Sequence, residues 1–502
     1  MLAGAVGLVV EGRVTRLTAN GVLEPGGSPA DTKTLFGIGS ITQLLLSLTV
    51  ARVGRQAIPL DTPVSTLLPD LTFDDNQSFS RVTARQLLSQ TSGLPSARRE
   101  LGPTDFDALS RFASEDLAHH VFQSPPGETA TYSGAAISLV GLILEQVMRR
   151  PFQDVLTRET LEHVGMRTAV FPSELSDAAV AWPHNRLHGD YQRAERLADN
   201  PAGYPSGFLL ASAEDLVGLV MRLFDGSVLG SKDLDHLAAQ QVSRHIDHVP
   251  YPLSLISSGY GLGSLTGTWN GHPVMRQGGS QQSFNCSVDV LPDTGSAIVL
   301  VTNAADEPTF NEILGLCYEA VGGPVRASDE PNLTSVGSEE KRSMVGDFVD
   351  PDRGRLLSIA DVDGDLFYRS GEVEAPIYHV GDGRAIVPVS YGSAPLWFPP
   401  ADGPVPYVVV WGQPFFRTSI EPWASKDPMM FEGLFRDSFW PDPSTDIDVR
   451  FGEGGWSVAG ASGTSNATPI GERRIVSDQG LIEFSEDGST LRLGNATIYE
   501  RS

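Results

Sequence analysis

The chain has 502 residues, enough for two or three domains with a sizeable core, and its 40% hydrophobic and 20% charged content is that of an ordinary globular protein. A formal net charge of −26 argues against nucleic acid or an anionic membrane as a partner, because both would repel so acidic a protein. Two cysteines are too few for a disulfide framework, no secretory signal is visible, and no apolar run reaches the roughly 18 residues of a membrane helix. We therefore expect a cytoplasmic protein.

The first part of the chain combines strand and helix patterns. Residues 4–23 predict a β-hairpin, and an extended run then ends at two glycines just before Ser40. A helix is predicted directly afterwards, because apolar residues recur at helical spacing at Ile41, Leu44, Leu45, Leu48 and Val53. Further helices are predicted over residues 136–148, 161–166, 212–223 and 310–321. Strands are predicted over residues 259–263, 284–290 and 297–301.

The last part of the chain has a different pattern. Residues 326–341 are rich in glycine, proline, serine and charge, which is typical of a linker. Beyond them, short alternating strands are separated by Asp-Gly turns, and each of two stretches has about the length of a small antiparallel barrel or sandwich. We predict an α+β first domain over residues 1–325, the linker over 326–341, and two β-barrel-like domains over 342–422 and 428–502.

Ser40 is the first candidate for a functional residue. It stands at a helix N-terminus, where unpaired backbone N–H groups and the positive end of the helix dipole favour developing negative charge. Gln43 lies one turn further on the same face, so its side chain can reach the Ser40 hydroxyl. A serine at this place is often only a helix N-cap. The motifs around it favour a position in a cleft, and we expect Gln43 to open to the same cleft.

Several segments together resemble one protein family. Ser40 and Gln43 occupy the ends of a stretch that is similar to the S-x-x-K nucleophile motif of penicillin-binding proteins and serine β-lactamases. In chain order there follow Leu87-Leu-Ser-Gln-Thr-Ser-Gly-Leu-Pro95, similar to L-L-x-H-T-S-G-L-P, and Tyr132-Ser-Gly134, similar to Y-S-N. Gln277-Gly-Gly-Ser-Gln-Gln-Ser-Phe284 is similar to the closing strand motif, in which a His or Lys precedes a glycine by two residues.

Residues 4 to about 321 thus resemble the β-lactamase/transpeptidase-like fold, an antiparallel sheet with a helical domain, in its class C β-lactamase, esterase and D-aminopeptidase branch. The two C-terminal β-units resemble the accessory barrels of D-aminopeptidases. The resemblance implies that Ser40 attacks a carbonyl carbon to form an acyl-enzyme and that Tyr132 handles the serine proton. It also implies an oxyanion hole made by backbone N–H groups of Ser40 and of the strand that carries Gly279.

Three positions depart from the family pattern. Gln43 replaces the lysine, Gly134 replaces an asparagine, and Gln277 replaces a basic residue of the substrate-binding strand. Sliding the last motif by one residue would place Arg276 at the basic position, but the spacing to Phe284 favours Gln277.

The lost cations weaken the expected chemistry. A free phenol titrates near pH ~10, and the family's cations would favour its ionised form. Without them Tyr132 is expected to remain a neutral phenol, which donates a hydrogen bond but is a weak base. General-base assistance is worth roughly 10²–10⁴-fold in rate, so acylation should be slow. This inference requires that neither Arg276 nor Lys33 lies beside the Ser40 hydroxyl and the phenol.

No metal site or other cofactor is expected. His184 and His188 are four residues apart and His245 and His248 three apart, spacings that can hold a metal on a helix. Neither pair has the accompanying glutamate of a zinc-protease helix, so we interpret these histidines as surface residues.

Three functions remain open from the sequence. The leading hypothesis is a serine hydrolase or acyltransferase that acts on an amide or ester of a small molecule or peptide. The second is a cyclase, isomerase or lyase that polarises a neutral carbonyl substrate in the same cleft without covalent attack. The third is a catalytically inactive binding protein. The sequence identifies neither the substrate nor the oligomeric state.

Overall fold

The computed structural model describes residues 3–501 except for positions 55, 97–101, 129, 177–178, 188–189, 195, 244–258, 305–306, 324–332, 351–354, 372, 382, 390–391, 411–412, 419, 421–427, 438–445, 453–454, 461–462, 471–472, 478–479 and 494–496.

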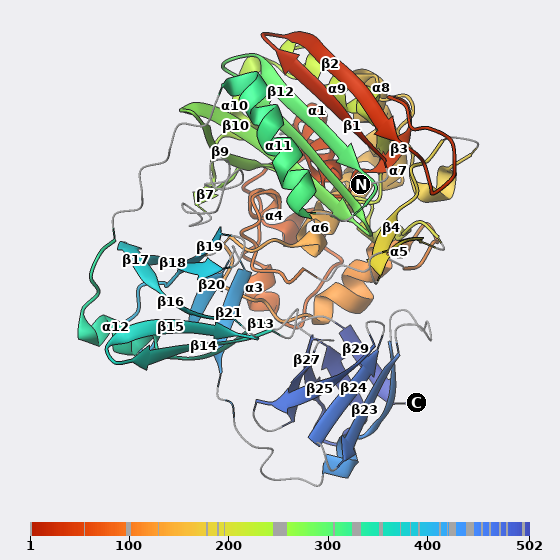
Figure 1. Ribbon diagram of the computed structural model, residues 1–502. Coiled ribbons are helices and arrows are strands. Elements are labelled where there is room, and N and C mark those ends of the chain that lie inside the picture. The colour runs from red at the N-terminus through yellow and green to blue at the C-terminus, as the bar shows by residue number, and fades with distance from the viewer. Residues whose placement is uncertain are drawn as a thin grey trace.

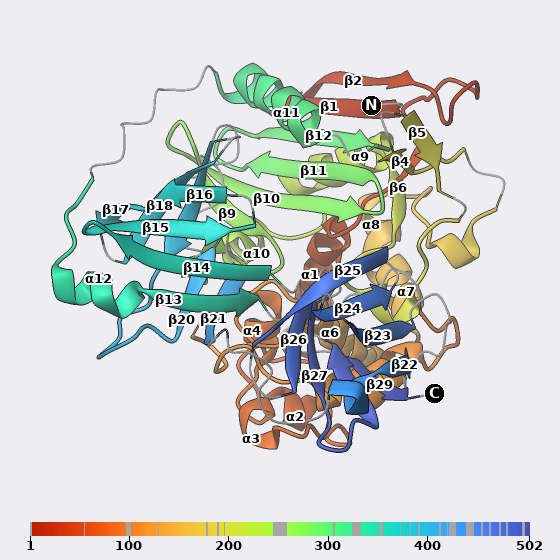
Figure 2. The ribbon, with the colours of Figure 1, turned by 60° about the horizontal axis from the view of Figure 1, so that its bottom comes forward.

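The first domain is built on an eight-stranded antiparallel sheet (Figure 1). Figure 2 shows its central strands lying side by side. The strand order is β2 (Arg13–Gly21), β1 (Ala3–Val10), β12 (Ser296–Thr302), β11 (Phe284–Leu291), β10 (His272–Gln281), β9 (Leu265–Trp269), β8 (Gly259–Tyr260) and β7 (Val242–Ser243). The N-terminal hairpin therefore pairs with β12, the last strand of the domain, in a register that runs from Gly4 opposite Thr302 to Val9 opposite Ala297.

Helices cover both faces of this sheet. Helix α11 (Glu307–Gly322) lies on the outer face, where Trp269, Leu314 and Tyr318 share a buried cluster. Helices α1 (Ile41–Val53) and α9 (Ala213–Phe224) contribute to the main core on the other face. Every residue of α1 from position 41 to 50 is buried, whereas the sequence pattern indicated one apolar face. The difference arises because the sheet and the helical part of the domain enclose α1 between them.

The helical part lies on the far side of α1 from the sheet (Figure 1). Its longest helix is α6 (Gly134–Met148). The shorter ones are α2 (Val64–Leu67), α3 (Asn76–Phe79), α4 (Ala84–Leu88), α5 (Ala108–Arg111), α7 (Phe152–Leu156), α8 (Glu162–Val164) and α10 (Ser231–Ala238). Two short ribbons complete the domain, β3 (Leu35–Gly37) with β6 (Leu210–Ser212), and β4 (His184–Leu187) with β5 (Asp190–Arg193).

Helix α12 (Ser338–Met344) leads into the first C-terminal β-unit, a nine-stranded antiparallel sheet that curls nearly closed. Its strands are β13 (Gly346–Asp350), β14 (Arg355–Val362), β15 (Asp365–Ser370), β16 (Val373–Pro376), β17 (Tyr378–Gly381), β18 (Arg384–Val389), β19 (Gly392–Trp397), β20 (Tyr407–Val410) and β21 (Gln413–Thr418).

The second C-terminal unit is a closed eight-stranded barrel. Its strands are β22 (Gly433–Asp437), β23 (Ile447–Gly452), β24 (Gly455–Gly460), β25 (Gly463–Pro469), β26 (Arg474–Ser477), β27 (Gly480–Phe484), β28 (Thr490–Leu493) and β29 (Thr497–Arg501). A small apolar cluster joins the two units, with Val349 from the first and Ile470, Val476 and Leu481 from the second.

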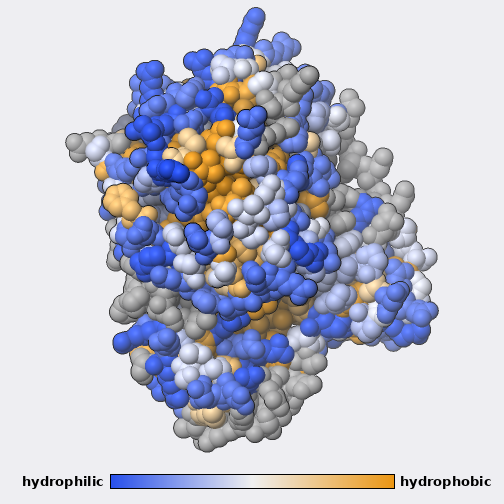
Figure 3. Space-filling view, turned by 180° about the vertical axis from the view of Figure 1, so that it is seen from behind, coloured by the Kyte–Doolittle hydropathy of each residue, from blue (hydrophilic) through white to orange (hydrophobic). Residues whose placement is uncertain are grey.

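These observations confirm the predicted fold class, an α+β domain followed by two small antiparallel β-units. Residues 326–332 of the predicted linker and residues 421–427 of the second break lie outside the described residues. Both cysteines are buried and unpaired. None of the helices in the described part of the chain is both long and apolar enough to cross a membrane. Seen from behind, apolar surface gathers in the upper part of the molecule, where the first domain lies (Figure 3).

Helix α6 carries a half-buried acid, Glu145, that makes stability depend on pH. Burial raises the pKa of Glu145 from 4.5 to about 7, while the Phe152 N–H, which donates to Glu145 Oε1 at 2.8 Å, opposes the rise. The folded state therefore holds this proton more tightly than the unfolded state does. The resulting stabilisation is complete below about pH 4.5 and is lost as the pH rises through about 7.

We predict that Glu145→Gln, which keeps the acceptor oxygen, removes this loss and unfolds at a higher temperature than the wild type at pH 8. The expected gain is roughly 1–3 kcal/mol at pH 8 and little at pH 5. Thermal unfolding at both pH values measures it. Glu162→Gln, on the exposed side of α8, is the matched control. An equal effect of Glu145→Gln at both pH values would contradict the prediction.

Candidate active site

Ser40 lies where the turn before α1 meets strand β10. Gly39 has a φ of 50°, and a Cβ on it would lie 2.8 Å from the backbone nitrogen of Ser280. A Cβ on Gly279 would lie 1.9 Å from the carbonyl oxygen of Ile38, far inside van der Waals contact. The two glycines thus allow a strand and a helix start to touch backbone to backbone. This contact sets the Ser40 amide beside β10.

The Ser40 side chain does not cap its helix. It makes no hydrogen bond to the first turn of α1, and its Oγ instead lies 2.6 Å from the hydroxyl of Tyr132. Within the described part of the chain, the Ser40 backbone N–H donates to no other group. A serine hydroxyl, a phenol and a backbone N–H donor therefore lie close together at the start of α1.

Gln43 supports this pair from inside the protein. Its Nε2 donates to the Tyr132 hydroxyl at 2.5 Å and to the carbonyl oxygen of Ser206 at 3.3 Å. Its side chain does not open to the cleft as expected, because Gln43 is only 2% exposed and lies behind Tyr132. The amide occupies the place of the family's lysine and keeps its hydrogen bond to the phenol, without a charge.

Gln277 also makes a structural contact. Its Nε2 donates to the carbonyl oxygen of Ser40 at 2.9 Å, which ties β10 to the start of α1. Gly134 is the first residue of α6, and Ser133 caps that helix by accepting from the Ala136 N–H at 2.9 Å. A Cβ on Gly134 would make only ordinary contacts, 3.4 Å or more from its neighbours. A side chain at position 134 is therefore sterically allowed.

A hollow of about 350 Å³ opens in front of Ser40 and runs along β10. Its lining comes entirely from the first domain, at Ser40, Tyr132, Tyr260, Leu265, Arg276, Gln277, Gly278, Gly279, Ser280, Asn285, Cys286, Phe310 and Asn311. Among these described residues there is one cation, Arg276, and no carboxylate. The exposed Lys33 does not line it.

Arg276 lies at this hollow but is held away from Ser40. Its Nε is 3.5 Å from Oδ1 of Asp289, its cross-strand neighbour on β11, and its side chain is 8% exposed. Burial raises the pKa of Asp289, which the Arg276 guanidinium opposes. Adjacent residues of a strand point to opposite faces, so Arg276 and Gln277 cannot both face Ser40. The cation is bound on the α11 side of the sheet.

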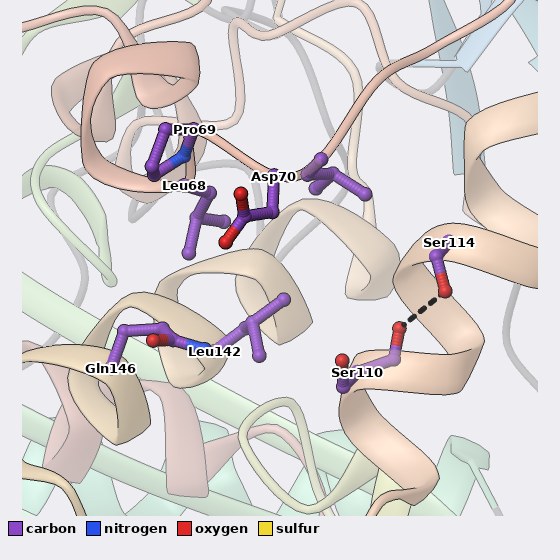
Figure 4. Close-up of a pocket in the computed structure, with 8 residues that line it drawn as sticks. Leu68, Pro69, Asp70, Ser110, Ser114, Leu142 and Gln146 are labelled. Carbon is purple, nitrogen blue, oxygen red and sulfur yellow. Dashed lines mark hydrogen bonds between the residues drawn. The ribbon is translucent and has the colours of Figure 1, made fainter.

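A second, smaller pocket lies in the helical part and shares no residue with this hollow. Leu142 and Gln146 of α6 face Asp70 across it, and Ser114 Oγ donates to the Ser110 carbonyl oxygen at 3.0 Å (Figure 4). Its serines have no general base or second hydroxyl beside them in the described contacts. The hollow at Ser40 is therefore the candidate active site.

Two site residues were missed by the sequence analysis. Gln90 donates from Nε2 to Oε1 of Gln43 at 3.4 Å, and Ser206 supplies the carbonyl that accepts from Gln43. Gln90 stands where the L-L-x-H-T-S-G-L-P pattern has its histidine, so this departure was a usable signal. Ser206 belongs to none of the family motifs, so the sequence offered no signal for it.

The interpretation of His184 as a surface residue is wrong. His184 is fully buried on β4, and its Nδ1 lies 2.7 Å from the carbonyl oxygen of Trp182. Its burial lowers its pKa. The four-residue spacing to His188 was judged as a helical pattern, but His184 lies on strand β4, where its side chain is buried. His188, His245 and His248 lie outside the described residues.

Comparisons with known proteins show the family of the first domain. The family model described as Beta-lactamase matches residues 1–315. Penicillin-binding protein 4 of Amycolatopsis lactamdurans is 27% identical over 326 residues, which are 62% of this chain and 84% of that protein.

Two solved structures share the fold. SurE crystallised with D-Leu has a TM-score of 0.64 at 21% identity, over 83% of this chain and 95% of SurE. EstCE1, a hydrolase with promiscuous acyltransferase activity, has a TM-score of 0.54 at 20% identity, over 64% of this chain and 93% of EstCE1. At these identities the likeness establishes the fold alone. With a family model that covers most of the first domain and with the predicted segments in place, the chain belongs to the beta-lactamase family.

Proposed function

We propose that the protein is a serine hydrolase or acyltransferase that acts on an ester or amide of a small molecule or peptide. Ser40 is the nucleophile, Tyr132 handles its proton, and Gln43 supports the phenol. The observation that carries the proposal is the 2.6 Å contact between Ser40 Oγ and the Tyr132 hydroxyl at the start of α1. A serine used only as a helix cap would not make this contact.

The reaction follows from these positions. Ser40 Oγ attacks the substrate carbonyl carbon in those molecules in which Tyr132 is ionised, and the serine proton passes to the phenolate oxygen while the Ser40 N–H, facing β10, stabilises the oxyanion. Tyr132 then delivers a proton to the leaving group, which departs as the acyl-enzyme forms. Water or an amine repeats the sequence in reverse and releases the acyl group as an acid or an amide.

Gln277 and Gly279 form part of the wall on which the substrate lies, because Gln277 holds the Ser40 backbone and Gly279 brings β10 close. Gly134 does not line the hollow, and Arg276 is paired with Asp289 on the α11 side of the sheet, so neither residue has a substrate-binding role in this proposal.

Because the glutamine side chains of this site carry no charge, we expect the protein to act on substrates that are easily cleaved. Without a cation beside it, Tyr132 is a weak base, and general-base assistance worth roughly 10²–10⁴-fold is largely lost. Esters with good leaving groups need less help from the enzyme than amides, whose amine must be protonated as it leaves. Because SurE was crystallised with D-Leu and EstCE1 is a hydrolase with acyltransferase activity, activated esters of D-amino acids are the first substrates to test.

We predict that a fluorophosphonate labels Ser40 and that Ser40→Ala abolishes both the adduct and ester hydrolysis. Tyr132→Phe should slow labelling about 100-fold or more, because the proton acceptor is lost. Mass spectrometry of the adduct and the hydrolysis rate of a nitrophenyl ester measure these effects. Ser110→Ala and Tyr378→Phe, both at exposed positions, are the matched controls.

The same variants separate the other two hypotheses. Turnover of a carbonyl substrate that survives Ser40→Ala but not Tyr132→Phe would replace acyl transfer by a cyclase, isomerase or lyase reaction. The lack of any adduct under forcing conditions, together with no turnover of any ester or amide, would leave a binding protein.

We also predict that Gln43→Lys raises the labelling rate tenfold or more. A lysine Nζ at this position would have the same two acceptors as the Gln43 amide, the Tyr132 hydroxyl and the Ser206 carbonyl oxygen. Its positive charge would favour the ionised phenol. Gln43→Met, which removes the donor without adding charge, should lower the rate. An unchanged or lower rate in correctly folded Gln43→Lys would show that the missing charge does not limit the reaction.

A further inference from the structure

Gln90 holds the segment around Tyr132 from both sides. It follows α4 with a φ of 61°, a left-handed conformation that is uncommon for a residue with a side chain, and it is 1% exposed. Its carbonyl oxygen accepts from the Thr131 N–H at 2.8 Å, and its Oε1 accepts from the Ser133 N–H at 2.7 Å. The residues before and after Tyr132 are thus both bound to Gln90.

The hydrogen bonds of Gln90 fix the direction of its amide. A backbone N–H can only donate, so the oxygen of the Gln90 amide must face Ser133, and its nitrogen must face Gln43. The oxygen of Gln43 then faces Gln90, and its nitrogen faces Tyr132. The contact between Gln43 and Ser206 requires the same orientation, because the Ser206 carbonyl oxygen can only accept and must therefore face the nitrogen of Gln43.

We propose that Gln90 is a positioning residue that determines which end of the Gln43 amide faces Tyr132. This inference rests on the proposed function, in which Tyr132 receives the Ser40 proton. With Gln90 in place, Gln43 directs an N–H at the phenol oxygen, which favours the ionised phenol that accepts the Ser40 proton. If Gln43 were reversed, its carbonyl oxygen would face the phenol oxygen and disfavour that ionised form.

The Gln43 amide needs a second hydrogen bond to fix its orientation, because side-chain amides rotate easily. The bond from Gln43 to Ser206 is 3.3 Å long and the bond from Gln90 to Gln43 is 3.4 Å long, so each alone gives only a weak preference and the two together fix one orientation. Gln90 adds the second constraint through Ser133, whose N–H belongs to the backbone and cannot reverse. The lysine of the family pattern has three equivalent donors and needs no such constraint, so the role of Gln90 arises with Gln43.

Substitutions at position 90 test this role through the rate of Ser40 labelling. Gln90→Leu, which removes both bonds, should slow labelling about tenfold, the effect of one lost hydrogen bond. Gln90→His should stay within about threefold of the wild type, because a neutral imidazole accepts at one nitrogen and donates from the other. Gln146→Glu, at the exposed pocket in Figure 4, is the matched control for an added carboxylate.

Gln90→Glu gives the distinguishing result. A protonated carboxyl accepts from Ser133 and donates to Gln43, but a carboxylate only accepts and would draw the Gln43 nitrogen away from Tyr132. We predict near wild-type labelling at low pH and a loss of tenfold or more as the new carboxyl ionises. Equal rates for all variants, or equal losses at every pH with no rescue by Gln90→His, would overturn the proposal.

A readout without catalysis separates this inference from the proposed function. In protein labelled with ¹⁵N-glutamine, the side-chain NH₂ signals of Gln43 are identified by their loss in Gln43→Met. They should shift in both Gln90→Glu and Tyr132→Phe, because Gln90 contacts the amide oxygen of Gln43 and Tyr132 contacts its N–H group. If wild-type Ser40 is never labelled, the proposed function fails. If the Gln43 signals do not respond to Gln90→Glu, the positioning role fails.

Discussion

The contact between strand β10 and the turn before α1 is the constraint on which the active site depends. Gly279 and Ile38 approach so closely that a single methyl group would not fit between them. Gln277 then ties the strand to the Ser40 carbonyl oxygen. Strand β10, which comes late in the sequence of the first domain, thereby determines where helix α1, near the N-terminus, begins. The hollow, the Ser40 amide and the orientation of the Ser40 side chain all follow from this one contact.

Amides take the place of charges throughout this site. Gln43, Gln90 and Gln277 stand where the family pattern has lysine, histidine and a basic residue, and each makes a hydrogen bond that helps to hold the site together. Hydrogen bonds preserve geometry, but only a charge strongly favours an ionised phenol beside it. The proposed active site therefore keeps its hydrogen-bonded geometry without the positive charge that would favour an ionised Tyr132. A side-chain amide has a donor nitrogen and an acceptor oxygen, so each of these glutamines must also adopt one of two orientations. A lysine ammonium group, which only donates, has no such requirement.

Strand register keeps Arg276, the cation among the described residues that line the hollow, away from Ser40. Arg276 and Gln277 are neighbours in sequence, yet the first pairs with Asp289 on the α11 side of the sheet and the second contacts Ser40. Side chains alternate along a strand, so a shift of one residue would exchange these places. The buried pair with Asp289 also stabilises the guanidinium where it is, because an unpaired charge in this position would be costly.

The sequence by itself determined the local features of this protein. The spacing of apolar residues predicted helix α1 and strands β1, β2, β11 and β12, and the motifs around Ser40 and Tyr132 indicated the family. Only the tertiary structure decided that Gln43 is buried behind Tyr132, that Asp289 binds Arg276, and that Gln90 donates a hydrogen bond to Gln43. Helical spacing and glycine turns are properties of neighbouring residues, and a sequence displays them directly. Hydrogen-bond direction and charge pairing depend on residues far apart in the chain, and these meet only after the sheet has closed on the helices.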